Sequence, residues 1–96
     1  MNEMPVGPVL RASAQSEFII SAMKEMNPEL KVISKGSYYR VSAPGHCIVT
    51  REKIQQYSGQ EFTLPEDLEL NMVSFQGNLE LDENQASWVA SGEEKL

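Results

Sequence analysis

"LELNMVSFQGNLELDE", residues 68–83, is the stretch that decides how the second half of the chain folds. Apolar and polar residues alternate along it, and Gln76-Gly77-Asn78 interrupts it, which is typical of two antiparallel strands joined by a turn. Asn71 and Ser74 lie within the apolar run, and apolar residues fall on both faces of the first strand, so neither face is expected to be simply solvated. The stretch therefore predicts a β-hairpin whose polar residues serve either the core or a surface that meets another molecule.

The first quarter of the chain predicts one extended segment and one helix. "VGPVLRA", residues 6–12, predicts a short strand or an extended arm, because proline cannot donate a hydrogen bond in the middle of a sheet. Residues 13–26 carry the apolar spacing of an amphipathic helix, with Ser13 or Ser16 as its cap. Asn27-Pro28 ends this helix, because the residue before a proline is driven out of the helical region.

Short strands and short helices fill the rest of the chain. Residues 30–34, 37–42 and 46–50 are rich in β-branched and aromatic residues and are separated by Gly and Pro, which favours a meander. A last strand is expected at residues 85–90, with Trp88 on its inward face.

Two short helices are expected between these strands. Residues 50–59 have helical spacing, with Tyr57 facing inward. Residues 63–68 contain a capping box formed by Thr63 and Glu66.

This order of elements predicts a small single α+β domain. Consecutive strands are joined by tight turns, which favours antiparallel pairing around one main amphipathic helix and two short helices. A β-α-β-β unit followed by a similar unit suggests a degenerate duplication. A chain of 96 residues has the length of one domain, which we place at residues 6–90, after a mobile leader at 1–5 and before a frayed tail at 91–96.

Charge and cysteine content narrow the classes of partner and compartment. The chain has 14 acidic and 8 basic residues, a net charge of −6, and basic residues that are scattered singly. Nucleic acid and anionic membranes favour clustered Lys and Arg, so neither is expected as a partner. The single cysteine forms no internal disulfide, and the start of the chain has neither the basic nor the apolar region of a signal peptide. We therefore expect a cytoplasmic protein.

No group of residues carries the pattern of a catalytic or metal site. His46 and Cys47, the only residues of their kinds, are adjacent on a predicted strand and so point to opposite faces. Glu69 and Glu80 could face each other across the hairpin, but the carboxylates otherwise cluster in turns and helix starts. No phosphate-binding glycine loop is present. The sequence predicts no enzyme, with no catalytic, cofactor-binding or metal-binding residues.

The polar residues of the opening stretch keep two interpretations. Asn71, Ser74, Gln76 and Gly77 either hydrogen-bond within the domain and shape the strand, or belong to a surface that meets a protein. A buried asparagine without hydrogen-bond partners lowers the free energy of unfolding by roughly 1–3 kcal/mol. Under either interpretation Asn71 must therefore find hydrogen-bond partners. The apolar residues of the same stretch are core candidates: Leu70, Met72, Leu79 and Leu81.

Three stretches together resemble a known family. They are "VGPVLRA" at 6–12, "TREKIQQYSGQEF" at 50–62 and the opening stretch. The most specific pattern is L-x-x-N-x-x-S-F-x-G, which is matched by Leu68, Asn71, Ser74, Phe75 and Gly77. The chain resembles the effector, or coupling, proteins of bacterial multicomponent diiron monooxygenases. This family includes the regulatory protein of soluble methane monooxygenase and the effectors of phenol hydroxylase and toluene monooxygenase. The start of the chain is most similar to the toluene/alkene monooxygenase branch.

The resemblance implies a function without chemistry of its own. It implies a cofactor-free protein, monomeric when free, that docks on the large subunit of a diiron hydroxylase and alters the access and geometry of the metal site. Turnover then rises, and electron use is coupled to hydrocarbon oxidation, with a reductase and a Rieske-type ferredoxin as functional partners. The alternative is a stand-alone α+β interaction or ligand-binding module unrelated to oxygenases. The residues expected to meet the partner are Val6, Gly7, Pro8, Arg11, Asn71, Ser74, Phe75, Gln76 and Gly77.

Overall fold

Ten elements make up the chain in the computed structural model, which describes residues 3–90. In order they are β1 (Pro5–Arg11), α1 (Ala14–Met26), β2 (Lys31–Ser34), β3 (Tyr38–Pro44), β4 (His46–Thr50), α2 (Arg51–Ser58), α3 (Glu66–Asn71), β5 (Met72–Gln76), β6 (Asn78–Leu81) and β7 (Gln85–Val89). The predicted α+β class, with one main helix and two short ones, is confirmed. The predicted tail at 91–96 and the first two residues of the leader lie outside the described residues.

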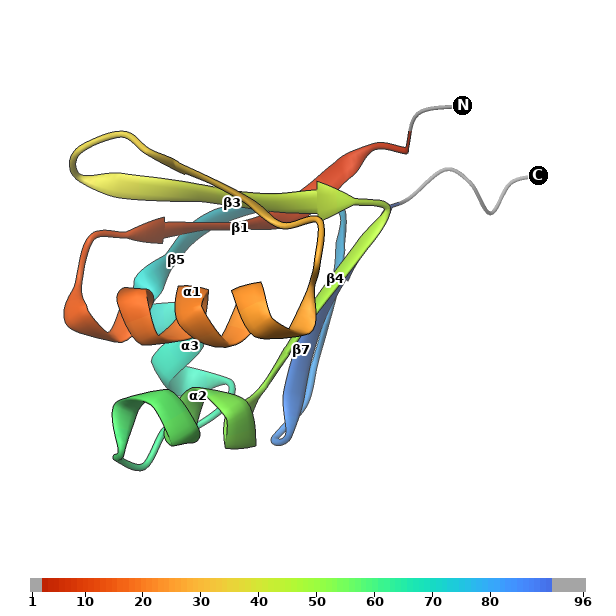
Figure 1. The fold of residues 1–96 in the computed structure, drawn as a ribbon. Helices are drawn as coiled ribbons and strands as arrows, with labels where there is room; N and C mark the ends of the chain where they lie inside the picture. Colours follow the sequence, from red (N-terminus) through yellow and green to blue (C-terminus); the bar gives the residue numbers. More distant parts are fainter. Residues whose placement is uncertain (1–2, 91–96) are drawn as a thin grey trace.

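The strands form two antiparallel sheets (Figure 1). One sheet has four strands in the order β2-β3-β1-β5, and the other has three in the order β4-β7-β6. β1, α1, β2 and β3 make a β-α-β-β unit, and β4, α2, β6 and β7 repeat its strand order, with α3 and β5 inserted. This is the topology that the expected duplication would produce.

The core lies between the two sheets and the helices. Figure 1 shows the helices on one side of the four-stranded sheet, with the strand pair β4 and β7 running down beside α1. Trp88 from β7 meets Val6 and Leu10 from β1 and Met23 from α1 in this core, and all four side chains are fully buried. The inward position of Trp88 is confirmed. The opposite face of the four-stranded sheet has no described helix over it.

Local side-chain contacts fix where the helices begin and end. Ser13 caps α1, because its Oγ accepts a hydrogen bond of 3.0 Å from the Ser16 backbone N–H. Asn27 ends α1, as predicted, and ties it to the second sheet. Its Nδ2 donates to the Ile48 carbonyl at 2.7 Å, and its Oδ1 accepts from the Ile48 N–H at 3.0 Å. The side-chain amide of Asn27 thus pairs with the backbone N–H and carbonyl of Ile48 as a neighbouring strand would.

The hairpin predicted at residues 68–83 does not form. Residues 68–71 belong to α3, whereas β5 pairs with β1 and β6 pairs with β7. The helical turn predicted before the hairpin continues, because Leu68 and Asn71 are three residues apart and share its buried face. Leu70 falls on the other side and is 64% exposed, so its assignment to the core is wrong. Met72, Leu79 and Leu81 are partly buried against the core.

Of the two possibilities for residues 6–12, the strand forms, so the alternative of an arm free to adapt to a partner is wrong. β1 lies inside its sheet, paired with β3 on one edge and β5 on the other. Val6, Gly7 and Pro8 are buried. Pairing with β3 runs up to Val6 and resumes at Val9, so the missing N–H of the proline falls between paired positions. Removing this segment would remove half of an inner strand.

Two predictions about the short helices need correction. Tyr57 does not face inward: it is 45% exposed, and its hydroxyl donates to a Glu25 carboxylate oxygen at 2.7 Å. The predicted capping box does not form, because the N-cap of α3 is Pro65, which makes no side-chain cap bond. The Thr63 N–H donates to Asp67 rather than to Glu66, at 2.8 Å.

Gly77 lets the chain cross from one sheet to the other. It lies between β5 and β6 with φ of +95°, a value that glycine tolerates and other residues rarely adopt. A Cβ placed there would lie 2.7 Å from Val6 Cγ1 and 2.9 Å from the Val89 carbonyl oxygen. Any side chain at this position would push the crossing chain away from both sheets.

We expect Gly77→Ala to lower the free energy of unfolding by about 3 kcal/mol or more, the sum of left-handed strain and overpacking. Gly36→Ala is the matched control, because Gly36 also has a positive φ, of +87°, but no atom lies within 4 Å of its added Cβ. It should lose only about 1–2 kcal/mol. Chemical denaturation of both variants measures the difference, and equal losses would contradict the steric argument.

Candidate docking surface

The strand register places one set of side chains on the helix-free side of the four-stranded sheet. Ile33 pairs with Arg40, Arg40 with Val9, and Val9 with Ser74, so these four form a row across all four strands. Directly paired residues share a face of the sheet. The neighbouring rows add Lys31 with Ser42, Gly7 with Gln76, and Arg11 with Tyr38. We call the residues of these rows, together with Val73, the outer face.

The outer face exposes apolar side chains on three of its four strands. Ile33 is 48% exposed, Tyr38 37% and Val73 62%. Val73 belongs here because it lines a shallow hollow of about 230 Å³ with Val9, Tyr38 and Arg40. A second hollow of about 150 Å³ lies over β1, β3 and the ends of β2 and β5. An apolar surface with shallow depressions is typical of a protein–protein contact rather than an enclosed ligand site.

The charge of the outer face differs from that of the whole chain. The four strands of this sheet contain no Asp or Glu. Arg11, Lys31 and Arg40 are exposed on it, and Lys35 is exposed in the turn between β2 and β3. The one ion pair between described residues, at 2.8 Å, joins Lys53 of α2 to Glu25 of α1. The cations of the outer face therefore have no salt-bridge partner within the described chain.

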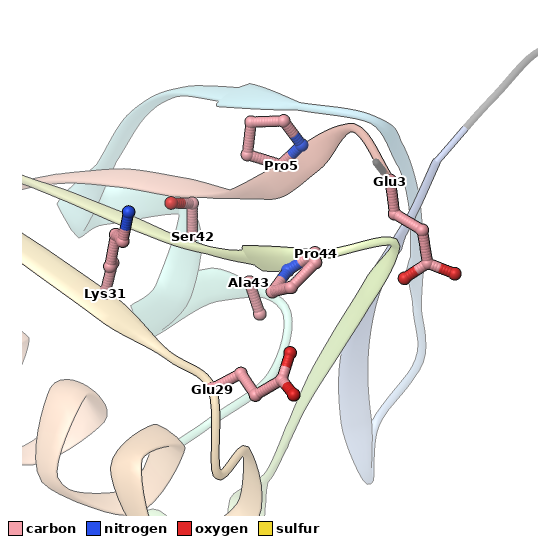
Figure 2. A pocket seen from close by; sticks show the side chains of 7 residues that line it. All are labelled: Glu3, Pro5, Glu29, Lys31, Ser42, Ala43 and Pro44. Carbon is pink, nitrogen blue, oxygen red and sulfur yellow. The ribbon is translucent and has the colours of Figure 1, made fainter. Parts of the chain in front are cut away.

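A cavity of about 400 Å³ marks one end of the outer face (Figure 2). It is lined by Glu3, Pro5, Glu29, Lys31, Ser42, Ala43 and Pro44. Lys31 and Ser42 reach it from the outer face, while Glu3 and Glu29 bring carboxylates from the segment before β1 and from the α1–β2 connection. Glu3 and Glu29 thus place carboxylates at the end of the four-stranded sheet, whose own strands contain none.

The structure separates the residues that the sequence grouped as a docking surface. Arg11, Ser74 and Gln76 lie exposed on the outer face, where contact with a partner stays a prediction. Phe75 pairs with Pro8 and so belongs to the other side of β5, where it is 43% exposed. The remaining residues have roles inside the domain: Val6, Asn71 and the tightly packed Gly77. Gly7 and Pro8 are also buried, although both line the smaller hollow of the outer face.

Sequence reasoning missed most of the outer face. Val9, Ile33, Tyr38, Arg40 and Val73 come from four strands, and only the pairing register brings them together. One signal was visible: residues 4–16 and 30–51 contain no acidic residue in a chain that has 14. Without the strand pairing, these two stretches free of acidic residues could not be placed on one face of the molecule.

Asn71 is the centre of a buried hydrogen-bond network. It is 1% exposed. Its Oδ1 accepts from Ser13 Oγ at 2.7 Å, and its Nδ2 donates to Gln15 Oε1 at 2.8 Å and to the Asp67 carbonyl at 2.9 Å. The amide therefore joins the start of α1 to the end of α3, immediately before β5. Of the two interpretations of Asn71, the structure supports the one within the domain.

We expect Asn71→Ala to lower the free energy of unfolding by about 2–3 kcal/mol, because the buried Ser13 hydroxyl and Asp67 carbonyl lose their partner. Gln15→Ala is the control: it removes one bond of the same network from an exposed side chain, and should cost under about 1 kcal/mol. Denaturant titration compares them. A loss in Asn71→Ala no larger than in Gln15→Ala would show that the network does not hold the helices together.

The candidate chemical groups do not combine into a reactive site. No group of three or more His, Cys, Asp or Glu side chains is placed to hold a metal within the described range 3–90. Cys47 is fully buried beside the Val6 carbonyl, 3.4 Å from its Sγ, and burial raises the pKa of this thiol to about 12. A thiol that stays protonated at neutral pH is a weak nucleophile and a poor metal ligand.

We expect Cys47 to resist a thiol reagent such as Ellman's reagent at pH 8 while the protein is folded, and to react within minutes once denaturant unfolds it. The raised pKa and the fully buried sulfur both act in this direction. The absorbance of the released thiolate measures the reaction. Rapid labelling of folded protein, at the rate of a free thiol peptide, would contradict this burial.

In the part of the chain that the structure describes, none of the helices is long and apolar enough to span a membrane.

Comparisons with known proteins give one consistent result. The model of the MmoB/DmpM family matches residues 4–89. The effector subunit of the alkene monooxygenase system from Xanthobacter autotrophicus (strain ATCC BAA-1158 / Py2) is 36% identical over 90 residues, which cover 92% of this chain and 88% of that protein.

Solved structures with this fold include two chains from structures of a phenol hydroxylase–regulatory protein complex. One has a TM-score of 0.81 at 20% identity and covers 90% of this chain and 98% of its own. The other has a TM-score of 0.75 at 24% identity, covering 88% and 100%. The soluble methane monooxygenase regulatory protein B has a TM-score of 0.69 at 22% identity, covering 100% and 72%. At these identities the likeness shows the fold.

Proposed function

The chain belongs to the MmoB/DmpM family, and on this premise we propose that it is an effector protein that binds the hydroxylase of a multicomponent diiron monooxygenase of the toluene/alkene type. The resemblance found in the sequence is thereby confirmed at the level of the family. The observation that carries the proposal is the alkene monooxygenase effector subunit, which is 36% identical across most of both chains. A stand-alone module unrelated to oxygenases does not account for this match.

The proposed protein does no chemistry and acts by binding. An effector changes its partner only if it binds two states of that partner with different affinity. Such coupling is typically worth about 1–3 kcal/mol. The hydroxylase would supply the metal site and the hydrocarbon pocket, while this chain would favour the state with higher turnover and tighter coupling of electron use to oxidation. We propose no catalytic residue, metal or cofactor in this chain.

We propose the outer face as the surface that meets the hydroxylase. Its exposed apolar side chains, Ile33, Tyr38 and Val73, lie among polar and basic ones, with Arg40 in the central row. Apolar, aromatic and arginine side chains are what protein–protein interfaces favour. The face is built on paired strands, so its side chains are held in place before the partner arrives. Preordered surfaces lose less entropy on binding than loops do.

The wider setting follows from the same proposal. A reductase and a Rieske-type ferredoxin would deliver electrons to the hydroxylase, in the cytoplasm, and this chain would join them as a monomer. The identity of the hydrocarbon would be set by the pocket of the hydroxylase, not by this chain.

We expect Val73→Asp to raise the concentration of this chain that gives half-maximal activation by about tenfold or more, since a charge would enter an apolar part of the contact. The assay uses a diiron hydroxylase of the toluene/alkene type with its reductase, and records product formed per reducing equivalent. Val73 is 62% exposed, so the fold should survive, as circular dichroism would verify.

Leu70→Asp is the matched control for this variant. Leu70 is 64% exposed but lies in α3, outside the rows of the outer face, and its variant should activate within about twofold of wild type, as for a surface change away from a contact. If wild-type protein fails to change either turnover or coupling at any concentration, the effector function is wrong. Equal losses of activation in Val73→Asp and Leu70→Asp would show that the outer face is not the contact surface.

A further inference from the structure

Charge is divided between two ends of the molecule. Four of the 8 basic residues lie on the outer face or in its adjoining turn, and no carboxylate lies on the four strands. The exposed acidic residues of the second half are on α2, α3, the segment between them and around the β6–β7 turn: Glu52, Glu61, Glu66, Glu69, Glu80, Asp82 and Glu83. In Figure 1, α2 and the β6–β7 turn lie far from the β1–β3 face. The net charge of −6 therefore conceals a basic face.

We infer that the outer face binds a protein surface that is acidic, one that presents carboxylates around an apolar patch. This inference rests on the proposed function, in which that surface belongs to the hydroxylase, and adds its chemical character. Arg11, Lys31, Lys35 and Arg40 have no salt-bridge partner within the described residues. The partner must supply the opposite charges if these cations are to be covered without a desolvation cost.

Arg40 is the residue on which recognition depends most. It sits within the central row, between Ile33 and Val9, and its side chain lines both hollows of the face. A guanidinium in this position can bind a carboxylate through two parallel N–H···O bonds, which fixes orientation as well as charge. The flanking apolar residues would exclude water and strengthen that pair.

A protein partner fits this surface better than a polyanion does. Nucleic acids and anionic lipids are bound by dense Lys and Arg that follow a line of phosphates. Here the cations are separated by the exposed apolar side chains of Ile33, Tyr38 and Val73. Arginine and aromatic residues around an apolar centre are instead what protein interfaces favour.

The division of charge also orients the approach of the two proteins. An acidic partner surface would repel the α2–α3 end and attract the outer face, so the molecule would turn its sheet toward the partner before contact. Steering of this kind raises association rates by about 10-fold to 1000-fold at low ionic strength and fades as salt is added. The association rate is therefore the quantity that the outer face should control.

The test measures association rates with the hydroxylase of an alkene monooxygenase system, by biolayer interferometry at about 20 mM and about 500 mM salt, where screening is weak and strong respectively. Arg40→Glu should slow association at low salt by about tenfold or more. Arg40→Lys should keep most of the rate, because it keeps the charge. Lys24→Glu is the matched control: it makes the same change in net charge on exposed α1, on the other side of the sheet, and should stay within about twofold.

Several outcomes would overturn the inference. Equal slowing by Arg40→Glu and Lys24→Glu would show that net charge acts rather than the face, and a faster Arg40→Glu would show that the partner surface is basic. Binding of wild type to heparin or DNA as tight as to the hydroxylase would point to a polyanion site instead. Activation of the hydroxylase by wild type tests the proposed function separately. If activation occurs and Arg40→Glu binds like wild type, only this inference fails.

Discussion

The rest of the structure depends on the pairing of β1 along both of its edges. This strand is hydrogen-bonded to β3 on one side and to β5 on the other, and it sends Val6 and Leu10 into the core with no exposed surface. Its close approach to β3 requires glycine at position 7, where a Cβ would lie 2.2 Å from the Val41 carbonyl oxygen. One strand thus supplies core contacts to the helices on one side and the backbone of the outer face on the other.

Local features of the sequence predicted local structure well. The boundaries of α1 follow from Ser13 and Asn27-Pro28, and those of α2 from the Thr50 cap and the left-handed Gly59, because caps and breakers act within one helical turn. Strand pairing is different, since a short apolar run can be helical or extended and its partner can be anywhere in the chain. The hairpin at residues 68–83 failed for this reason.

The candidate site was only partly predictable for the same physical reason. The sequence around Asn71 is equally compatible with an interface and with an internal network. Only the positions of Ser13 and Asp67 in the folded protein decide between these two roles. Val73 and Tyr38 line one hollow on the same side of a sheet, and neither segment alone shows the pairing that brings them together. The family resemblance indicated the function, but not which residues share a face of this sheet.

Buried amides connect the helices to each other and to the three-stranded sheet. Asn71 ends α3 directly before β5, and Asn27 bonds Ile48 of β4, which follows β3 by one glycine. A polar network that is fully satisfied favours a single arrangement of the elements it joins. The two networks therefore hold α1 in place against α3 and β4.

The position of β1 also has a consequence for biosynthesis. Gly7 pairs with Gln76, and Leu10 with Met72, so β1 receives its second neighbour only after β5 has been made. Contacts this distant in sequence form slowly, because the intervening loop must close first. A nascent chain that stops before β5 would expose one edge of β1, a site where unfinished chains could pair with each other. The four-stranded sheet is thus completed only after β5 has been synthesised.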